Sequence, residues 1–211
     1  MITQPNITRP FEATLHQVLI QENLKELFDR HGSDKASNHN YHLVYAWIFA
    51  NLGFDAIHIM EIGLGTNNID TPSNMGKKGR PGASLRAWRD YSTNCEVIGL
   101  DIDARVLFTE ERIQTHQLDQ TDSSSWELLS HLVEFNSVNL FVDDGLHSPE
   151  ANLRSLIYGP QYISKGGFIV VEDIHERMLP VWRLVVGLAP KTWKTWIIRS
   201  RNSYLFVAQI T

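Results

Sequence analysis

The stretch IMEIGLGT at residues 59–66 ends an apolar run with one acid and two glycines, which is typical of a strand that leads into a ligand-binding turn. Four more strand-like runs follow it, and three of them end in carboxylates. The carboxyl ends of parallel strands meet at one edge of a sheet. We therefore expect one crevice to gather seven acids, namely Glu61, Asp101, Asp119, Asp143, Asp144, Glu172 and Asp173.

Length and composition predict a single globular domain. The chain has 211 residues, 43% of them apolar, which is enough for one buried core and short for two domains. The formal net charge of −5 gives no general attraction to nucleic acid, so no nucleic-acid partner is expected. The one cysteine, Cys95, excludes an intramolecular disulfide framework. No signal peptide or membrane-length apolar run is evident, which favours a cytoplasmic protein without a membrane partner.

Alternating strand and helix patterns predict an α/β fold with a doubly wound, mostly parallel seven-stranded sheet and a C-terminal antiparallel hairpin. Residues 1–55 are expected to form a helical cap and entry loop within the same domain, and residues 56–211 the core. The expected strands are 57–62, 95–101, 112–118, 138–143 and 167–172, with the hairpin at 193–199 and 204–210. The expected helices are 14–30, 41–52, 82–92, 124–135, 149–158 and 175–187.

Two classes of doubly wound protein carry a Gly-x-Gly turn after the first strand. A dinucleotide-binding turn needs a third glycine and, about twenty residues later, an acid on the next strand. Here Asn68 takes the place of that glycine and Asp101 comes much later, so a nicotinamide cofactor is disfavoured. An acid directly before Gly63 and Gly65 instead resembles the first motif of class I S-adenosylmethionine-dependent methyltransferases, whose Rossmann-like fold also ends in an antiparallel hairpin.

Further motifs occur in the same order along the chain. They are GASLRAW at 82–88, DQTD at 119–122, DDGLH at 143–147 and VEDI at 171–174, preceded by GSDK at 32–35. Together they resemble the family of metal-dependent sugar O-methyltransferases that modify macrolide antibiotics. The chain is shorter than those enzymes and carries a long insertion at 66–82.

The resemblance implies S-adenosylmethionine as the cofactor. Gly63 and Gly65 would let the backbone approach it, because glycine has no Cβ. Glu61 would hold the turn and face the amino end of the cofactor, or would cap the turn without touching a ligand. Asp101 would accept hydrogen bonds from both ribose hydroxyls.

The third strand and the helix after it are expected to hold the adenine end. Asp119 and Gln120 stand where the family has its adenine pocket. Asp122 could instead be the N-cap of the following helix.

The crevice has more acids than a cofactor needs, which argues for a metal. Crowded carboxylates repel one another unless they are protonated or neutralised, and Mg²⁺ neutralises them through oxygen ligands. By resemblance, Asp144, Glu172 and Asp173 are the ligands. Asp143 would be an alternate ligand or would face the cofactor with its main chain. Alternatively, Glu172 and Asp173 cap the helix expected near His175.

His147 is the candidate general base, and Asp144 shares the catalytic role as the neighbouring metal ligand. An imidazole that titrates near neutrality can take a proton from a hydroxyl as its oxygen attacks the methyl group, and a bound metal would lower the pKa of that hydroxyl. In the alternative, His147 is a third metal ligand or a helix-start residue.

We therefore predict Mg²⁺-assisted methyl transfer from S-adenosylmethionine to a hydroxyl of a sugar or glycosylated small molecule, and the sequence leaves room for a homo-oligomer. One alternative is a metal-independent methyltransferase of another small molecule. Another is a binding protein that keeps the cofactor pocket without chemistry. The loop at 32–42, with Asp34, Lys35 and His39, could be a lid over the crevice or an ordinary solvated loop.

Overall fold

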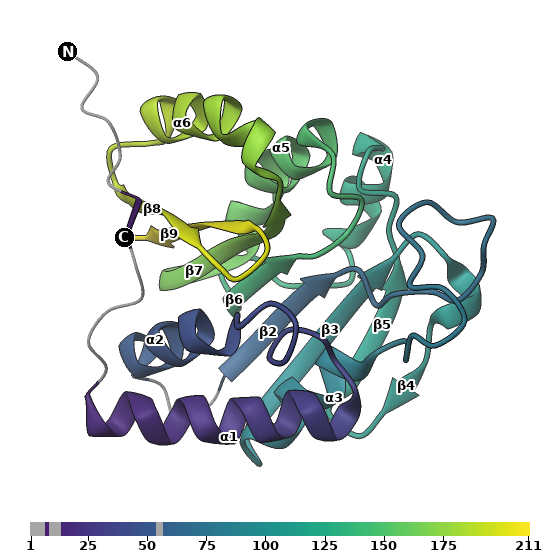
Figure 1. Cartoon of the computed structure of the whole chain (residues 1–211). Helices are drawn as coiled ribbons and strands as arrows, with labels where there is room; N and C mark the ends of the chain where they lie inside the picture. Colours follow the sequence, from purple (N-terminus) through teal and green to yellow (C-terminus); the bar gives the residue numbers. More distant parts are fainter. Residues whose placement is uncertain (1–6, 9–13, 54–56) are drawn as a thin grey trace.

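A single sheet runs through the molecule (Figure 1). In the computed structural model, which describes residues 7–8, 14–53 and 57–211, the strand order is β1-β8-β9-β7-β6-β2-β3-β5-β4. Five adjacent strands are parallel, and they are β2 (Ile57–Ile62), β3 (Cys95–Asp101), β5 (Ile113–Gln117), β6 (Val138–Asp143) and β7 (Ile163–Ile174). The antiparallel pair β8 (Trp193–Arg199) and β9 (Tyr204–Ile210) joins the sheet where β9 pairs with β7. The predicted mostly parallel sheet and its C-terminal hairpin are thus confirmed. Two short strands, β1 (Ile7–Thr8) and β4 (Thr109–Glu110), add to the seven predicted.

Helices cover both faces of the sheet (Figure 1), which confirms the doubly wound architecture. One face carries α1 (Leu15–His31), α2 (His42–Leu52) and α3 (Ala83–Tyr91). The other face carries α4 (Ser123–Leu129), α5 (Pro149–Tyr158) and α6 (Leu179–Leu188). Short 3₁₀ turns are η1 (Ala104–Val106), η2 (Gly159–Tyr162) and η3 (Glu176–Met178).

Successive residues of each central strand enter two different apolar clusters. On β2, Ile59 packs into the cluster shared with α1 to α3, whereas Met60 packs into the cluster shared with α4 to α6. Side chains alternate between the faces of a sheet, and both faces of this one are covered. This explains why the central strands are almost continuously apolar in sequence. The same alternation decides where the acids at the strand ends point.

Three predicted boundaries were wrong. The helix predicted at 124–135 ends at Leu129, because residues 130–137 turn back toward β6 and Asn136 adopts a left-handed conformation with φ of 57°. β7 begins at Ile163 rather than 167, and a register shift against β6 accommodates the Gly-Gly pair at 166–167 within the strand. α6 begins at Leu179 rather than 175, after η3 and with a proline in its first turn, where proline is favoured.

The chain reverses its direction of travel across the sheet between β2 and β6. From β2 it proceeds to β3 and β5 on one side, and it then returns to place β6 on the other side of β2. Ligands of open α/β sheets bind at such a switch point, outside the carboxyl ends of the strands. Here the Asp144 N–H donates to the Ile62 carbonyl oxygen at 2.9 Å, so the Gly-x-Gly turn and the DDGLH motif are neighbours.

The first two helices pack on the sheet. Buried side chains of α1 and α2, among them Leu27 and Tyr45, belong to the same apolar cluster as Ile59. The predicted boundary between residues 1–55 and 56–211 lies outside the described residues. Among the helices in the described part of the chain, none is both long and apolar enough to cross a bilayer.

Candidate active site

A cavity of about 270 Å³ lies at the switch point. The Gly-x-Gly turn forms one wall, and Thr71 to Ser73 of the 66–82 insertion form another. Of the residues that the sequence assigns to the cofactor, those that line this cavity are Gly63, Gly65, Asp101, Asp119 and Gln120, together with Asp144 of the predicted metal site. Glu61 and Asp143 are not among the lining residues.

Asp101 is held in place by backbone donors. The Leu64 N–H donates to Oδ2 and the Asp103 N–H donates to Oδ1, each at 2.8 Å. Burial raises the pKa of the Asp101 carboxyl, although these backbone hydrogen bonds lower it. A carboxylate has about four acceptor positions, and backbone donors at Asp103, Leu64 and Gly65 leave at least one of them for a ligand. Asp101 can therefore accept hydrogen bonds from within the cavity.

Glu61 lies beneath the turn. Its carboxylate accepts hydrogen bonds from Ser84 Oγ at 2.7 Å and from the indole N–H of Trp88, both on α3. Glu61 is two residues after Ile59, so it points to the same α1–α3 side of the sheet. These hydrogen bonds tie Glu61 to α3, and both its hold on the turn and its contact with a cofactor stay predictions.

Asp143 points to the opposite side of the sheet and is completely buried. It accepts hydrogen bonds from Gln120 Nε2 at 2.7 Å and from Asn152 Nδ2, on α5, at 3.0 Å. Gln120 Oε1 in turn accepts a hydrogen bond from the Leu146 N–H at 3.2 Å. Asp143 therefore fixes Gln120 from behind the cavity wall.

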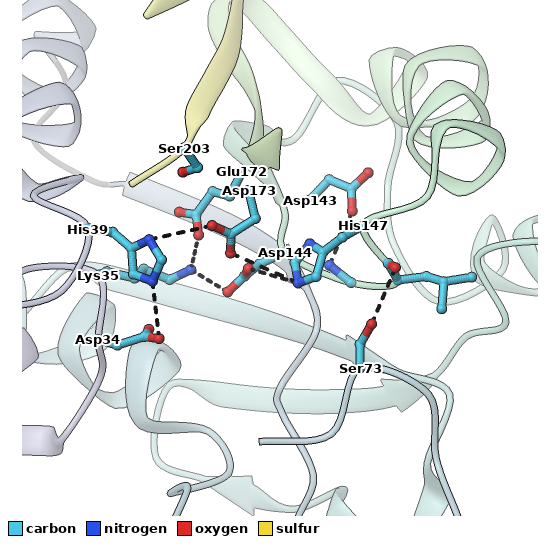
Figure 2. A network of polar contacts seen from close by, with 12 residues as sticks. Asp34, Lys35, His39, Ser73, Asp143, Asp144, His147, Glu172, Asp173 and Ser203 are labelled. Carbon is cyan, nitrogen blue, oxygen red and sulfur yellow. Dashed lines mark hydrogen bonds and ion pairs between the residues drawn. The ribbon is translucent and has the colours of Figure 1, made fainter. Parts of the chain in front are cut away.

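Three side chains form a candidate metal site beside the cavity, to which Asp144 belongs as a lining residue (Figure 2). Asp144, His147 and Asp173 each offer a ligand atom, and these atoms lie within 4.8 Å of one another. His147 Nε2 is 3.9 Å from Asp144 Oδ1 and 4.0 Å from Asp173 Oδ2. The two carboxylates suit a hard divalent cation such as Mg²⁺ or Mn²⁺, and the imidazole beside them can act either as a further ligand or as a base. The residues present therefore fit the predicted metal.

Backbone conformation also marks this cluster. His147 and Asp173 both adopt left-handed conformations, with φ of 55° and 54°. Non-glycine residues rarely do so, and such conformations persist where the surrounding structure imposes them, often at functional sites. Tyr41 contributes to that constraint at Asp173, because its hydroxyl donates to Oδ1 at 2.6 Å.

Glu172, the third predicted ligand, points elsewhere. Its carboxylate lies 2.5 Å from Lys35 Nζ and accepts a hydrogen bond from the Tyr45 hydroxyl. Burial raises the pKa of Glu172 well above its ordinary value, although Lys35 lowers it. The structure thus brings Asp144 and Asp173 together with His147, and it places Glu172 on the inner side of Asp144.

Lys35 is the site residue whose position the sequence did not reveal. Its side chain is 2% exposed, and Nζ lies 2.6 Å from Asp144 Oδ2 and 3.4 Å from Glu61 Oε1. Burial disfavours the ammonium ion, but the surrounding carboxylates outweigh burial and raise the pKa of Lys35 well above its ordinary value. Burial also raises the pKa of Asp144 to about 6, against the lowering effects of Lys35 and His147. The GSDK motif drew attention to this segment, but its polar setting gave no sign of burial.

The strand order, the antiparallel C-terminal hairpin and the cavity at the switch point are those of the class I S-adenosylmethionine-dependent methyltransferase fold. The fold agrees with that of the solved MycE methyltransferase from the mycinamycin biosynthetic pathway in complex with Mg, SAH and mycinamycin VI. That structure has a TM-score of 0.60 and 25% sequence identity, over 76% of this chain and 39% of that chain.

Sequence comparison points to the same group of proteins, although no family model matches the chain. The chain is 30% identical over 154 residues to an 8-demethyl-8-alpha-L-rhamnosyl tetracenomycin-C 2'-O-methyltransferase of Streptomyces olivaceus, a match that covers 73% of this chain and 38% of that protein. It is 28% identical over 158 residues to a demethylmacrocin O-methyltransferase of Streptomyces fradiae, over 74% of this chain and 38% of that protein. The resemblance to sugar O-methyltransferases is therefore confirmed, and the chain spans about two fifths of the length of these relatives.

Proposed function

We propose that this protein transfers a methyl group from S-adenosylmethionine to a hydroxyl of a sugar on a glycosylated small molecule, with assistance from Mg²⁺. One observation carries the proposal: Asp144 lines the cavity and also belongs to the Asp144–His147–Asp173 cluster. A donor in the cavity and a hydroxyl at the cluster would therefore be neighbours. The names of the relatives support the acceptor class, since they refer to a rhamnosyl tetracenomycin and to demethylmacrocin.

In this proposal the cavity orients the donor. Asp101 accepts hydrogen bonds from the ribose hydroxyls, and Asp119 and Gln120 hold the adenine end. Gly63 and Gly65, which line the cavity, let the backbone come close to the methionine part, because glycine has no Cβ. The acids at the rim favour a cationic sulfonium electrostatically.

His147 acts as the base beside Asp144, a residue that lines the cavity. The acceptor hydroxyl gives its proton to His147, and the oxygen attacks the methyl carbon. The C–O bond forms as the C–S bond breaks, which leaves S-adenosylhomocysteine and a protonated imidazole. Bound Mg²⁺ would lower the pKa of the acceptor hydroxyl, and Asp144 and Asp173 would hold the ion. Glu172, the third ligand expected by resemblance, is paired with Lys35 instead.

The test combines binding with methyl transfer. We expect calorimetry to detect S-adenosylhomocysteine binding, and we expect labelled methyl groups to reach rhamnosylated polyketide acceptors. His147→Gln should keep cofactor affinity and lower kcat at least about 100-fold, the usual contribution of a general base. The exposed His131 provides a matched control, because His131→Gln should change neither quantity.

Each other outcome decides between functions. Activity that survives chelation and dialysis would favour the metal-independent methyltransferase. Cofactor binding without transfer to any acceptor would favour the binding protein, and failure to bind the cofactor would refute the proposal altogether. A cytoplasmic location, a small-molecule partner instead of nucleic acid, and assembly as a homo-oligomer complete the proposal.

A further inference from the structure

Asp144 divides the acids at the rim into two clusters (Figure 2). The outer cluster is Asp144 Oδ1, His147 and Asp173. The inner cluster is Asp144 Oδ2, Glu61 and Glu172, and it surrounds the ammonium group of Lys35. Each cluster has the oxygen donors that a divalent cation needs.

The inner cluster alone would be a strong cation site. Glu61 and Glu172 are almost fully buried, at 0% and 1% exposure, so their charges are poorly screened by solvent. With the partly exposed Asp144 beside them, these carboxylates would have to remain protonated or to take up a cation. An ammonium ion has three donors and no acceptor, which matches three carboxylate oxygens.

The loop that carries Lys35 is fixed from both sides. Within the loop, the Tyr41 N–H donates to the Lys35 carbonyl oxygen at 2.7 Å. From the β8–β9 turn, the Arg201 N–H donates to Asn40 Oδ1 at 2.8 Å, and Asn202 Nδ2 donates to the Asn38 carbonyl oxygen at 2.9 Å. These hydrogen bonds fix the loop, and the loop holds the Lys35 ammonium group in the inner cluster.

We propose that Lys35 is a positioning residue that fills the inner cluster and so keeps the divalent cation on the outer side of Asp144, beside His147. This inference rests on the proposed function. A metal in the inner cluster would lie between Glu61 and Glu172, and Glu61 does not line the cavity. Such an ion would be unable to meet an acceptor hydroxyl that also reaches His147. Lys35 thus decides where the metal binds and takes no part in the chemistry itself.

Lys35→Met removes the charge and keeps much of the apolar length of the side chain. We take roughly 6 Å as the separation between the Lys35 ammonium group and a divalent cation in the outer cluster. Even with the dielectric constant of water, their repulsion then corresponds to about a tenfold change in the affinity for the cation. We therefore expect Lys35→Met to bind Mn²⁺ at least about tenfold more tightly than the wild type, measured by electron paramagnetic resonance. At saturating Mn²⁺ its kcat should still be at least about 100-fold lower, because the ion is misplaced.

A second substitution locates the ion. In the wild type, Asp173→Asn should abolish Mn²⁺ binding. In the Lys35→Met background the same substitution should leave the affinity nearly unchanged, because the ion then sits in the inner cluster. Lys194→Met, at an exposed position on β8, is the control for a general charge effect and should leave Mn²⁺ affinity as it is.

Loss of Lys35 could also prevent folding, since it leaves buried acids without a counter-charge. The comparison is therefore repeated with Glu61→Gln against the double variant Lys35→Met/Glu61→Gln, which has one buried acid fewer. The same increase in Mn²⁺ affinity is expected between these two proteins. A purely structural role for Lys35 would lower the melting temperature without raising Mn²⁺ affinity.

Failure of this inference can be told apart from failure of the proposed function. If the wild type binds S-adenosylhomocysteine and Mn²⁺ but loss of Lys35 leaves Mn²⁺ affinity equal or weaker in both comparisons, the role of Lys35 is refuted and the methyltransferase proposal stands. If the wild type binds neither, the proposed function itself is refuted.

Discussion

Replacement of Gly63 by alanine is expected to damage both halves of the site at once. Gly63 has a φ of +95°, and a Cβ there would lie 2.1 Å from the Asp144 carbonyl oxygen and 2.6 Å from its carbonyl carbon. Real Cβ atoms essentially never come closer than 3.0 Å and ordinary contact begins at 3.4 Å, so the two backbones must separate by 0.9 Å at least and by 1.3 Å to reach ordinary contact. The atoms in the way are main chain, and a rotamer change cannot relieve the clash.

The chain offers a matched control for the backbone strain. Gly166 has a φ of +87°, and a Cβ there would meet no atom within 4 Å. Gly166→Ala should therefore cost only the left-handed conformation, about 1–2 kcal/mol. Gly63→Ala should cost that amount and a further 1–3 kcal/mol or so for the overpacking.

Two assays separate the effects. Urea unfolding gives the free energy of unfolding of each variant, and calorimetry gives its affinity for S-adenosylhomocysteine. Gly63→Ala moves Asp144 and the turn that contacts Asp101, so the affinity should fall about tenfold or more, which corresponds to 1.4 kcal/mol. Gly166→Ala should bind as the wild type does. Equal stability and equal affinity of the two variants would refute the close approach of Gly63 to Asp144.

Three further predictions concern single groups. Asp101→Asn places an amide donor against a backbone N–H and removes a charged acceptor. Calorimetry should therefore show that S-adenosylhomocysteine binds about tenfold more weakly or worse. Unchanged affinity would exclude the ribose contact. Because the pKa of Asp144 is raised to about 6, protons should compete with the cation for this carboxylate. Mn²⁺ affinity, measured by electron paramagnetic resonance, should therefore fall as the pH drops below about 6. Constant affinity from about pH 5 to 7 would contradict this. Cys95 is fully buried, and burial raises the pKa of its thiol to about 12. A disulfide reagent at about pH 8 should therefore label Cys95 only after the protein is unfolded in urea. Rapid labelling of the folded protein would be inconsistent with that burial.

The sequence predicted the acids at the rim because a local rule governs them. Asp101, Asp119 and Asp144 each follow a strand of one parallel sheet, and the carboxyl ends of such strands share an edge. The apolar runs alone therefore identify the edge at which these side chains gather.

The inward or outward direction of each acid could also have been counted from the sequence. Glu61 and Glu172 each come two residues after an apolar residue of the α1–α3 cluster, Ile59 and Val170, and so point to that side. Asp143 comes two residues after Phe141, which belongs to the other cluster, and it points to α5. Strand parity was the unused signal, and it separates Glu61 and Glu172 from Asp143.

Lys35 is a different case. Its partners Asp144 and Glu172 are 109 and 137 positions away, on the ends of two strands, whereas Lys35 comes from a loop between two helices. No periodicity links these segments, and the polar composition of the loop suggests exposure. Only the folded arrangement of α1, the loop and the sheet brings the ammonium group to the acids.

The most direct test is a crystal structure of the wild-type protein with S-adenosylhomocysteine and Mn²⁺, with the ion identified by its anomalous signal. We expect the ribose hydroxyls to contact Asp101 and the Mn²⁺ peak to contact both Asp144 and Asp173, on the side of His147. A nucleoside bound outside the cavity, or a peak that contacts neither carboxylate, would contradict a shared rim for donor and metal.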